Sequence, residues 1–138
     1  MQGMKILVID DEPDLVRALG MRLSSRGYEV STAYDGVQAM SKIASESPDL
    51  VLLDIHLPAG NGYRICERLR SQPKTWGIPV IAITADPRPE AEQKCRRYGC
   101  AAFFRKPYDP HRLLEAIEEA LPTERIMAGP QPEAAKAP

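Results

Sequence analysis

The 138-residue sequence has no marked excess of one charge, no long apolar run and no recognisable cysteine motif. Its formal net charge is −1, so no electrostatic argument favours binding to nucleic acid or to an anionic membrane. No apolar stretch approaches the roughly 20 residues that a membrane-spanning helix needs. The N-terminal residues enter a strand-like run directly, without the layout of a signal peptide. We therefore expect a soluble cytoplasmic protein without membrane contact.

Motifs for metal, redox and nucleotide chemistry are also missing. The three cysteines, Cys66, Cys95 and Cys100, are odd in number and match no metal or redox spacing. We expect Cys66 and Cys95 to pack as small hydrophobic side chains on helices. No G-x-x-x-x-G-K-[ST] precedes the first apolar run, and no G-x-G-x-x-G follows it. The absence of these motifs argues against a P-loop NTPase and against a dinucleotide-binding fold.

The most informative stretch is a short apolar run, residues 50–53, that ends in Asp54. Its length and the flanking Pro48 and Pro58 predict a strand buried on both faces, as in a parallel sheet. Asp54 would then lie at the carboxyl end of the strand, where open α/β sheets bind their ligands. From this position alone, Asp54 is equally well interpreted as a turn cap.

Strand-like runs and helical patterns alternate along the whole chain. This alternation predicts a doubly wound α/β fold with a five-stranded parallel sheet in the order 2-1-3-4-5, flanked by five helices. We expect the domain to span residues 4–122, and the Pro- and Ala-rich residues 123–138 to be a flexible tail or a linker stub. The predicted strands cover residues 5–9, 28–33, 49–54, 79–84 and 101–105.

Helical spacing also predicts which side chains face the core. For the second helix these are Val37, Met40, Ile43 and Ala44, and Met21 of the first helix is expected to fill the core or its border. The helix over residues 90–98 has few apolar side chains to bury, so we expect it to be the least firmly anchored helix.

Polar residues end four of the predicted strands: Asp10 and Asp11, Asp54, Thr84 and Lys106. Carboxylates brought together at one sheet edge repel one another unless a cation joins them, and Mg²⁺ is a suitable ion. An Asp beside such an ion can attack phosphorus and form an acyl phosphate. A lysine amine and a threonine hydroxyl could then contact the phosphoryl oxygens.

In these residues the chain resembles a response-regulator receiver domain of bacterial two-component signalling, a CheY-like domain with the flavodoxin-like fold. The resemblance covers residues 5–121 and rests on the ordered set rather than on any one motif. The matching residues are Asp10 and Asp11, Asp54 with Leu57-Pro58 and Gly62, Thr84-Ala85, and Lys106-Pro107.

The resemblance implies that a sensor histidine kinase or a phosphotransfer protein phosphorylates Asp54. It implies a Mg²⁺ site formed by Asp11, Asp54 and the main-chain carbonyl of His56, with Asp10 acting directly or through a water. The chain would be a signalling switch rather than an enzyme, although it would catalyse its own phosphotransfer and slow dephosphorylation.

The resemblance also implies a conformational switch. Lys106–Pro107 would be a cis peptide, and Thr84 and Phe103 would occupy the switch positions. Phosphorylation would draw the Thr84 hydroxyl inward and turn the ring of Phe103 into the vacated space. The surface of the fourth helix, fifth strand and fifth helix would then change and act on a downstream protein or a fused output domain. A homodimer through the fourth and fifth helices is compatible with the sequence but is not indicated by it.

Three positions depart from the commonest receiver pattern or border the site. Asn61 stands where an acid is frequent, which should matter little. His56 and Asp86 lie beside the expected acyl phosphate and are candidates to tune its lifetime. For His56, a solvated loop side chain is an equally good interpretation.

Two alternative functions share parts of this pattern. A Mg²⁺-dependent phosphohydrolase with an Asp nucleophile uses similar chemistry, but it carries a D-x-D motif on its first strand. Here the first-strand acids are adjacent, and the candidate nucleophile is on the third strand. A phosphorylation-independent scaffold of the same fold usually lacks an Asp or the Lys, and none is missing here.

Overall fold

The computed structural model describes residues 3–57 and 62–121, within which five strands alternate with five helices. The predicted tail at 123–138 and Asn61 lie outside these residues. The elements are β1 (Lys5–Ile9), α1 (Pro13–Ser25), β2 (Glu29–Ala33), α2 (Gly36–Glu46), β3 (Leu50–Asp54), α3 (Gly62–Arg70), β4 (Val80–Thr84), α4 (Pro89–Arg97), β5 (Ala102–Arg105) and α5 (Pro110–Ala120).

The strands form one parallel sheet in the order β2-β1-β3-β4-β5, which confirms the predicted fold and strand order. The register pairs Ile9 with Leu53 and Asp54 with Ile83, so the strands end at nearly the same level. Consequently, the residues that follow β1, β3, β4 and β5 meet at one edge of the sheet.

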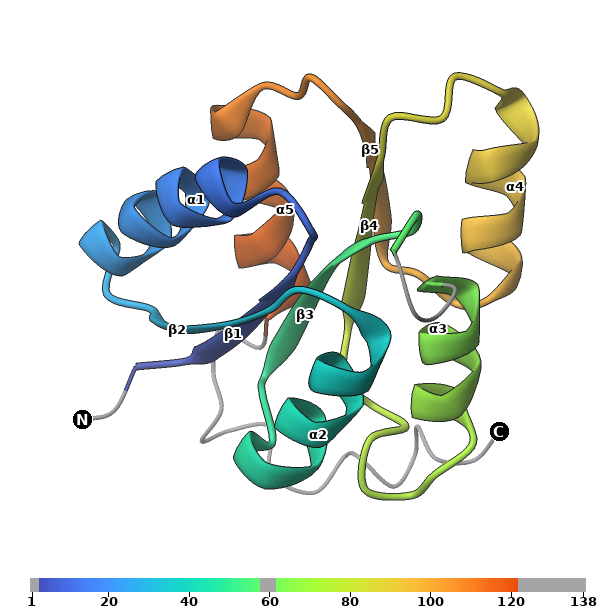
Figure 1. The fold of residues 1–138 in the computed structure, drawn as a ribbon, viewed down its shortest axis with the longest axis horizontal. Helices are drawn as coiled ribbons and strands as arrows, with labels where there is room; N and C mark the ends of the chain where they lie inside the picture. The colour runs from blue at the N-terminus through green and yellow to red at the C-terminus, as the bar shows by residue number, and fades with distance from the viewer. Residues whose placement is uncertain (1–2, 58–61, 122–138) are drawn as a thin grey trace.

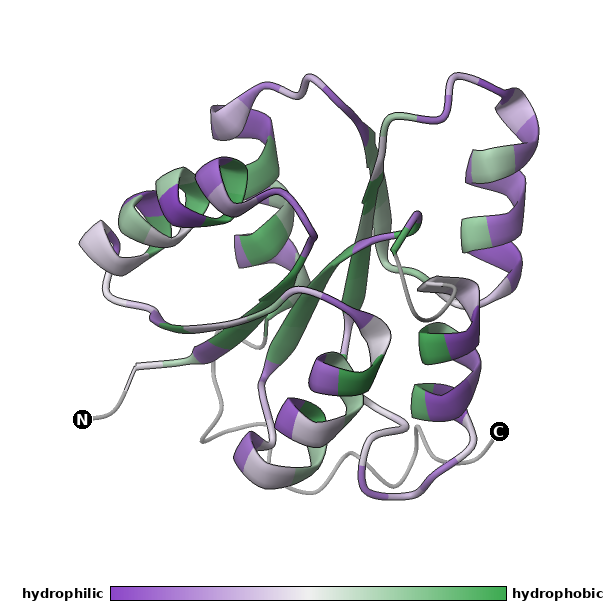
Figure 2. Ribbon diagram, in the orientation of Figure 1, coloured by the Kyte–Doolittle hydropathy of each residue, from purple (hydrophilic) through white to green (hydrophobic). Residues whose placement is uncertain are grey.

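Helices cover both faces of this sheet, with α1 and α5 on one face and α2, α3 and α4 on the other (Figure 1). Alternate residues of the central strand face opposite cores: Leu52 packs with the α1/α5 core, and Leu53 packs with the α2/α3/α4 core. Figure 2 shows the resulting pattern, with hydrophobic strands inside and hydrophilic stripes on the outer helix faces. Burial of both faces explains the unbroken apolar runs in the sequence.

The helix ends follow the local signals in the sequence. Pro13 begins α1, and Gly27 just beyond its end has a φ of 92°, a value that glycine adopts without strain. The side chain of Asp35 accepts a hydrogen bond from the main-chain N–H of Gln38 at the start of α2, and Asp109 caps α5 in the same way. In the described part of the chain, no helix combines the length and apolar character needed to cross a membrane.

Three side chains that were predicted to face the core are exposed. Val37 is 71% exposed and Met21 is 68% exposed, and Ala44 is exposed as well. Ile43 is buried as predicted and Met40 is partly buried, and the inner face of α2 also contains Gly36 and Ala39. The buried face of α2 is therefore rotated away from the predicted one, so that Val37 lies toward solvent.

Candidate functional site

The polar residues singled out in the sequence converge at the carboxyl edge of the sheet. Asp10 follows β1, Asp54 and Thr84 are the last residues of β3 and β4, and Lys106 follows β5. Asp10, Asp54 and Thr84 are among the few buried polar residues in the described part of the chain. The edge therefore holds buried charge that hydrophobic packing does not explain.

Three carboxylates form the acidic part of the site. One oxygen each from Asp10, Asp11 and Asp54 can be chosen so that all lie within 4.8 Å of one another. Asp10 is 3% exposed and Asp54 is 5% exposed, whereas Asp11 is open to solvent. Hard oxygen donors at this spacing and with this partial exposure match the ligands that Mg²⁺ takes, including the waters it retains.

Lys106 brings the positive charge into this cluster. Its ammonium Nζ lies 3.0 Å from Asp10 Oδ2, 3.2 Å from Asp54 Oδ2 and 3.3 Å from Glu12 Oε1. The Lys106 side chain is only 14% exposed, so its ion pairs with Asp10 and Asp54 are largely shielded from water, whereas the Glu12 side chain is 60% exposed. The contact with Glu12 was not predicted. The position of Glu12 directly after Asp10 and Asp11 was the feature of the sequence that could have indicated it.

The site carries more negative charge than Lys106 can neutralise. Burial raises the pKa of the Asp54 carboxyl, and the nearby charge of Asp10 raises it further, while Lys106 opposes both effects. Burial alone would lower the pKa of Lys106, but its hydrogen bond to Asp10 and the charge of Asp54 outweigh burial and raise it. A divalent cation would relieve the remaining repulsion, so the residues present fit Mg²⁺.

Short loops hold the acids in place. The main-chain N–H of His56 donates to Asp54 Oδ1 at 3.0 Å, and the main-chain N–H of Glu12 donates to Asp10 Oδ1 at 3.0 Å. Gly62 lies directly against the backbone of Ile55, because a Cβ added at Gly62 would fall 2.7 Å from the Ile55 oxygen. Only glycine permits this approach, which explains physically why the sequence has Gly62 here.

The two candidate switch residues lie on neighbouring strands. Thr84 is fully buried, and its hydroxyl oxygen accepts a hydrogen bond from the main-chain N–H of Asp86 at 3.1 Å. Phe103 is half-buried against the α2/α3/α4 core, and the Arg105 guanidinium lies 5.0 Å from the centre of its ring. The Lys106–Pro107 peptide bond beside them is cis.

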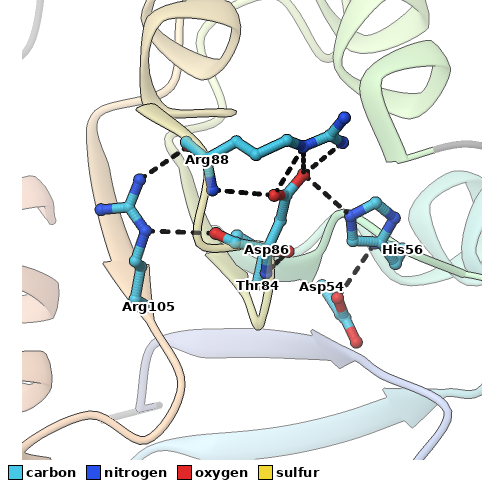
Figure 3. A network of polar contacts seen from close by, with 6 residues as sticks. All are labelled: Asp54, His56, Thr84, Asp86, Arg88 and Arg105. Atoms are coloured by element: carbon cyan, nitrogen blue, oxygen red, sulfur yellow. Dashed lines mark hydrogen bonds and ion pairs between the residues drawn. The ribbon is translucent and has the colours of Figure 1, made fainter. Parts of the chain in front are cut away.

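Figure 3 shows a polar network over the β4–α4 loop. Arg88 donates to both carboxylate oxygens of Asp86, at 2.9 Å and 2.7 Å, and these hydrogen bonds hold the pKa of Asp86 well below its usual range. His56 Nε2 lies 3.4 Å from Asp86 Oδ2, and the His56 side chain is 59% exposed, so both interpretations of His56 stay open. Arg105 donates to the main-chain oxygens of Asp86, at 3.1 Å, and Arg88, at 2.9 Å. No role was predicted for Arg88 or Arg105, because the prediction was based on the acids, the threonine and the lysine at the strand ends.

A groove adjoins the acidic cluster between α1 and the loop before α5. It shares Lys106 and Glu12 with the cluster, and its remaining lining is mainly apolar, including Leu15, Ala18 and Pro107.

Comparison with known protein families decides the classification. The family model described as the response regulator receiver domain matches residues 6–118. The chain belongs to the response regulator receiver domain family. Receiver domains are signalling switches of two-component systems, which excludes the phosphohydrolase alternative as the family of this chain.

Individual relatives agree with this assignment. The receiver domain is 42% identical over 114 residues to the response regulator PleD of Caulobacter vibrioides, covering 82% of this chain and 25% of PleD. It is 37% identical over 117 residues to the response regulator ArlR of Staphylococcus aureus, covering 85% of this chain and 52% of ArlR. The chain thus spans about a quarter to a half of the length of these relatives.

Solved structures show the same fold. The chemotaxis response regulator CheY4 of Vibrio cholerae superposes with a TM-score of 0.80 at 28% identity, over 87% of this chain and 100% of CheY4. The BeF3-activated N-terminal receiver domain of Klebsiella pneumoniae RstA gives a TM-score of 0.78 at 29% identity, over 84% of this chain and 97% of that domain.

Proposed function

We propose that this receiver domain accepts a phosphoryl group on Asp54, in a Mg²⁺-dependent reaction, and thereby switches the surface formed by α4, β5 and α5. The observation that carries the proposal is the meeting of three carboxylates within 4.8 Å with the Lys106 ammonium 3.2 Å from Asp54. This combination supplies a nucleophile, a place for a divalent cation and a fixed positive charge in one small, partly buried site.

Each residue would have a distinct part in the transfer. An Asp54 oxygen attacks phosphorus, and the bond between phosphorus and the donor histidine nitrogen breaks. Asp10, Asp11, Asp54 and the main-chain carbonyl of His56 would hold Mg²⁺, which would supply positive charge to the phosphoryl oxygens. Lys106 is already within 3.2 Å of Asp54 and would exchange this contact for one with the phosphoryl group.

The switch would start from the hydrogen bond that now holds Thr84. Its hydroxyl oxygen accepts from the Asp86 N–H, and a phosphoryl group on Asp54 would offer the hydroxyl a stronger, charged acceptor. Movement of Thr84 would release the β4–α4 loop and leave room for the Phe103 ring. Because Arg105 contacts both that ring and the loop, the change would reach the α4–β5–α5 surface.

We infer a cytoplasmic protein whose phosphodonor is a sensor histidine kinase or a phosphotransfer protein. The apolar groove beside Lys106 lies next to the path by which such a donor would reach Asp54. The output would act through a downstream protein or a fused domain, and a homodimer through α4 and α5 is one form that it could take. No part of the proposal requires this chain to bind nucleic acid or a membrane.

The test is phosphorylation by a small phosphodonor. Acetyl phosphate with Mg²⁺ is expected to add one phosphoryl group per chain, detected by intact mass, and chelation with EDTA should prevent it. Asp54→Asn should abolish the labelling, whereas Asp14→Asn, which alters a fully exposed acid on α1, should retain it.

Labelling that survives Asp54→Asn would refute the acceptor. Release of many phosphates per chain from the donor, rather than about one per phosphorylation cycle, would favour the hydrolase alternative. Labelling that is unaffected by EDTA would contradict the role of Mg²⁺.

A further inference from the structure

The three cysteines, which have no part in the proposed phosphoryl site, belong to the α2/α3/α4 core or pack against it. Cys66 comes from α3, Cys95 from α4, and Cys100 from the short connection between α4 and β5. Cys66 and Cys100 are 34 positions apart in sequence, yet their sulfur atoms lie 3.8 Å apart. This distance is direct contact between two free thiols.

The contact is close to the geometry of a disulfide. The two sulfur atoms would need to approach from 3.8 Å to the roughly 2.0 Å of an S–S bond. Cys66 is 1% exposed and Cys100 is partly buried, so Cys100 is the more exposed residue of the pair. The two thiols are therefore in contact, and the approach from solvent is on the Cys100 side.

Hydrogen bonds within the cluster affect all three thiols. The hydrogen bond with Cys100 lowers the pKa of the Cys66 thiol, and a hydrogen bond with Cys100 lowers the pKa of Cys95 as well, whereas the pKa of Cys100 is raised. Cys66 and Cys95 are equally buried, so neither pKa nor burial separates them. The 3.8 Å contact between the sulfur atoms selects Cys66 as the partner of Cys100.

We propose that Cys66 and Cys100 form a reversible disulfide when the protein meets a peroxide. One thiolate attacks a peroxide oxygen, breaks the O–O bond and becomes a sulfenic acid, releasing hydroxide. The second thiolate attacks that sulfur, forms the S–S bond and releases a second hydroxide. With the two thiol protons, hydrogen peroxide is reduced to two waters as two thiols are oxidised to one disulfide.

The disulfide would join α3 to the segment that connects α4 with β5. Figure 1 shows α3 and α4 on the same face of the sheet, so the bond would cross between neighbouring elements. This consequence rests on the proposed function: α4 and β5 belong to the surface that phosphorylation is proposed to move. Oxidation would tether that surface and weaken its response to a phosphoryl group on Asp54.

The sequence makes the pair directly identifiable. Trypsin cuts after Lys and Arg, which places Cys66 in residues 65–68, Cys95 in residues 95–96 and Cys100 in residues 98–105. The full chain is treated with hydrogen peroxide, blocked with N-ethylmaleimide, digested and mapped by mass spectrometry. The expected product joins residues 65–68 to residues 98–105, with a mass two hydrogens below the sum, and dithiothreitol separates it.

Variants decide which thiols are involved. Cys95→Ala should retain the cross-link, whereas Cys66→Ala and Cys100→Ala should each lose it. Cys100 is partly exposed, so Cys100→Ala leaves an informative variant even if replacing the buried Cys66 disturbs folding. A cross-link between residues 95–96 and 98–105 in the wild type, or three alkylated thiols after peroxide treatment, would overturn the assignment.

The effect on the switch needs a separate measurement. Hydrogen exchange in α4 is compared before and after acetyl phosphate and Mg²⁺, in reduced and oxidised protein. The change should be severalfold smaller in the oxidised wild type and unaffected by oxidation in Cys100→Ala. Equal changes in hydrogen exchange in the reduced and the oxidised protein would overturn the proposed effect of the disulfide on α4. Absence of any change in the reduced protein would count against the proposed function instead, and the peptide map would still decide the disulfide.

Discussion

At the residue scale, Lys106 faces more negative charge than it can neutralise. Its ammonium lies within 3.3 Å of carboxylates from Asp10, Glu12 and Asp54, while Asp11 completes the acidic cluster. Buried like charges destabilise the folded state, because the unfolded chain separates and solvates them. The arrangement suits the binding of a cation and a phosphoryl group at a cost in stability.

Removing the charge of Asp54 should therefore stabilise the metal-free protein. The folded pKa of Asp54 is raised, so the wild type loses stability as pH rises through that value, and Asn does not titrate. We expect Asp54→Asn to increase the free energy of unfolding at pH 7 in EDTA, measured by urea denaturation. The gain should disappear below about pH 4, where both states of the wild type bind the proton.

Asp86 provides a control, because we expect its replacement to change the free energy of unfolding in the opposite direction. Hydrogen bonds from Arg88 lower its pKa, so the ionised carboxylate stabilises the folded state. Asp86→Asn should lower stability at pH 7 in the same urea experiment. A gain from Asp86→Asn, or a loss from Asp54→Asn, would contradict this account of the charges.

His56 and Asp86 should also affect how long the acyl phosphate lasts. Their side chains lie 3.4 Å apart, and the main-chain N–H of His56 donates to Asp54. We expect His56→Ala and Asp86→Ala each to shorten the half-life of the phosphorylated protein severalfold, because water gains access to phosphorus. The measurement is decay of the phosphorylated mass after removal of the donor, with Arg17→Ala on the exposed face of α1 as the control. Unchanged half-lives would leave both residues without this role.

The main site residues could be predicted because each ends an apolar run. In a parallel sheet this local feature fixes the position of Asp54, Thr84 and Lys106 relative to one another. Arg88 and Arg105 could not be predicted in the same way. Their long side chains act at main-chain oxygens and at a loop carboxylate, and such contacts depend on the path of the β4–α4 loop rather than on a sequence pattern.

At the element scale, α4 is the helix with the least apolar burial. It buries only Ala91 and Cys95 as small side chains, whereas α5 buries Leu113, Leu114 and Ile117. Local opening should therefore cost less for α4.

Hydrogen exchange of the unphosphorylated protein tests this difference. Amides in the middle of α4 are expected to exchange on the order of tenfold faster than those in the middle of α5. Equal protection of the two helices would show that contacts other than apolar burial anchor α4, and would weaken its proposed role in the switch.

The limits of sequence prediction at this scale are visible in α2. Helical periodicity located the helix, but the predicted inner face was rotated toward Val37 and Ala44. The buried face contains Gly36, Ala39 and Ile43, and the rotation of a helix against a sheet is a tertiary property that periodicity does not report.

At the scale of the whole molecule, one sheet separates two cores that cannot fold independently. Leu52 and Leu53 are neighbours in β3, and both are buried, but they pack into opposite cores. Loss of either core should expose the shared strand and unfold the other core as well.

Truncation of each leucine tests this cooperativity. Leu52→Ala and Leu53→Ala should each reduce the free energy of unfolding by about 2–5 kcal/mol, with a single transition seen by circular dichroism and by fluorescence. Met21→Ala, at a side chain that is 68% exposed, should stay within about 0.5 kcal/mol of the wild type. Two separate transitions in either core variant would show that the cores are independent.

Arg105, at the end of β5, donates hydrogen bonds to the main-chain oxygens of Asp86 and Arg88 in the β4–α4 loop. Every amino acid provides such an oxygen, so this mechanical linkage does not depend on which side chains occupy those positions. Substitutions at positions 86 and 88 can therefore change the side chains beside the proposed phosphoryl site while Arg105 keeps its hydrogen bonds to the loop. Under the proposed function, the lifetime of the phosphorylated state and the movement of the loop could then evolve separately.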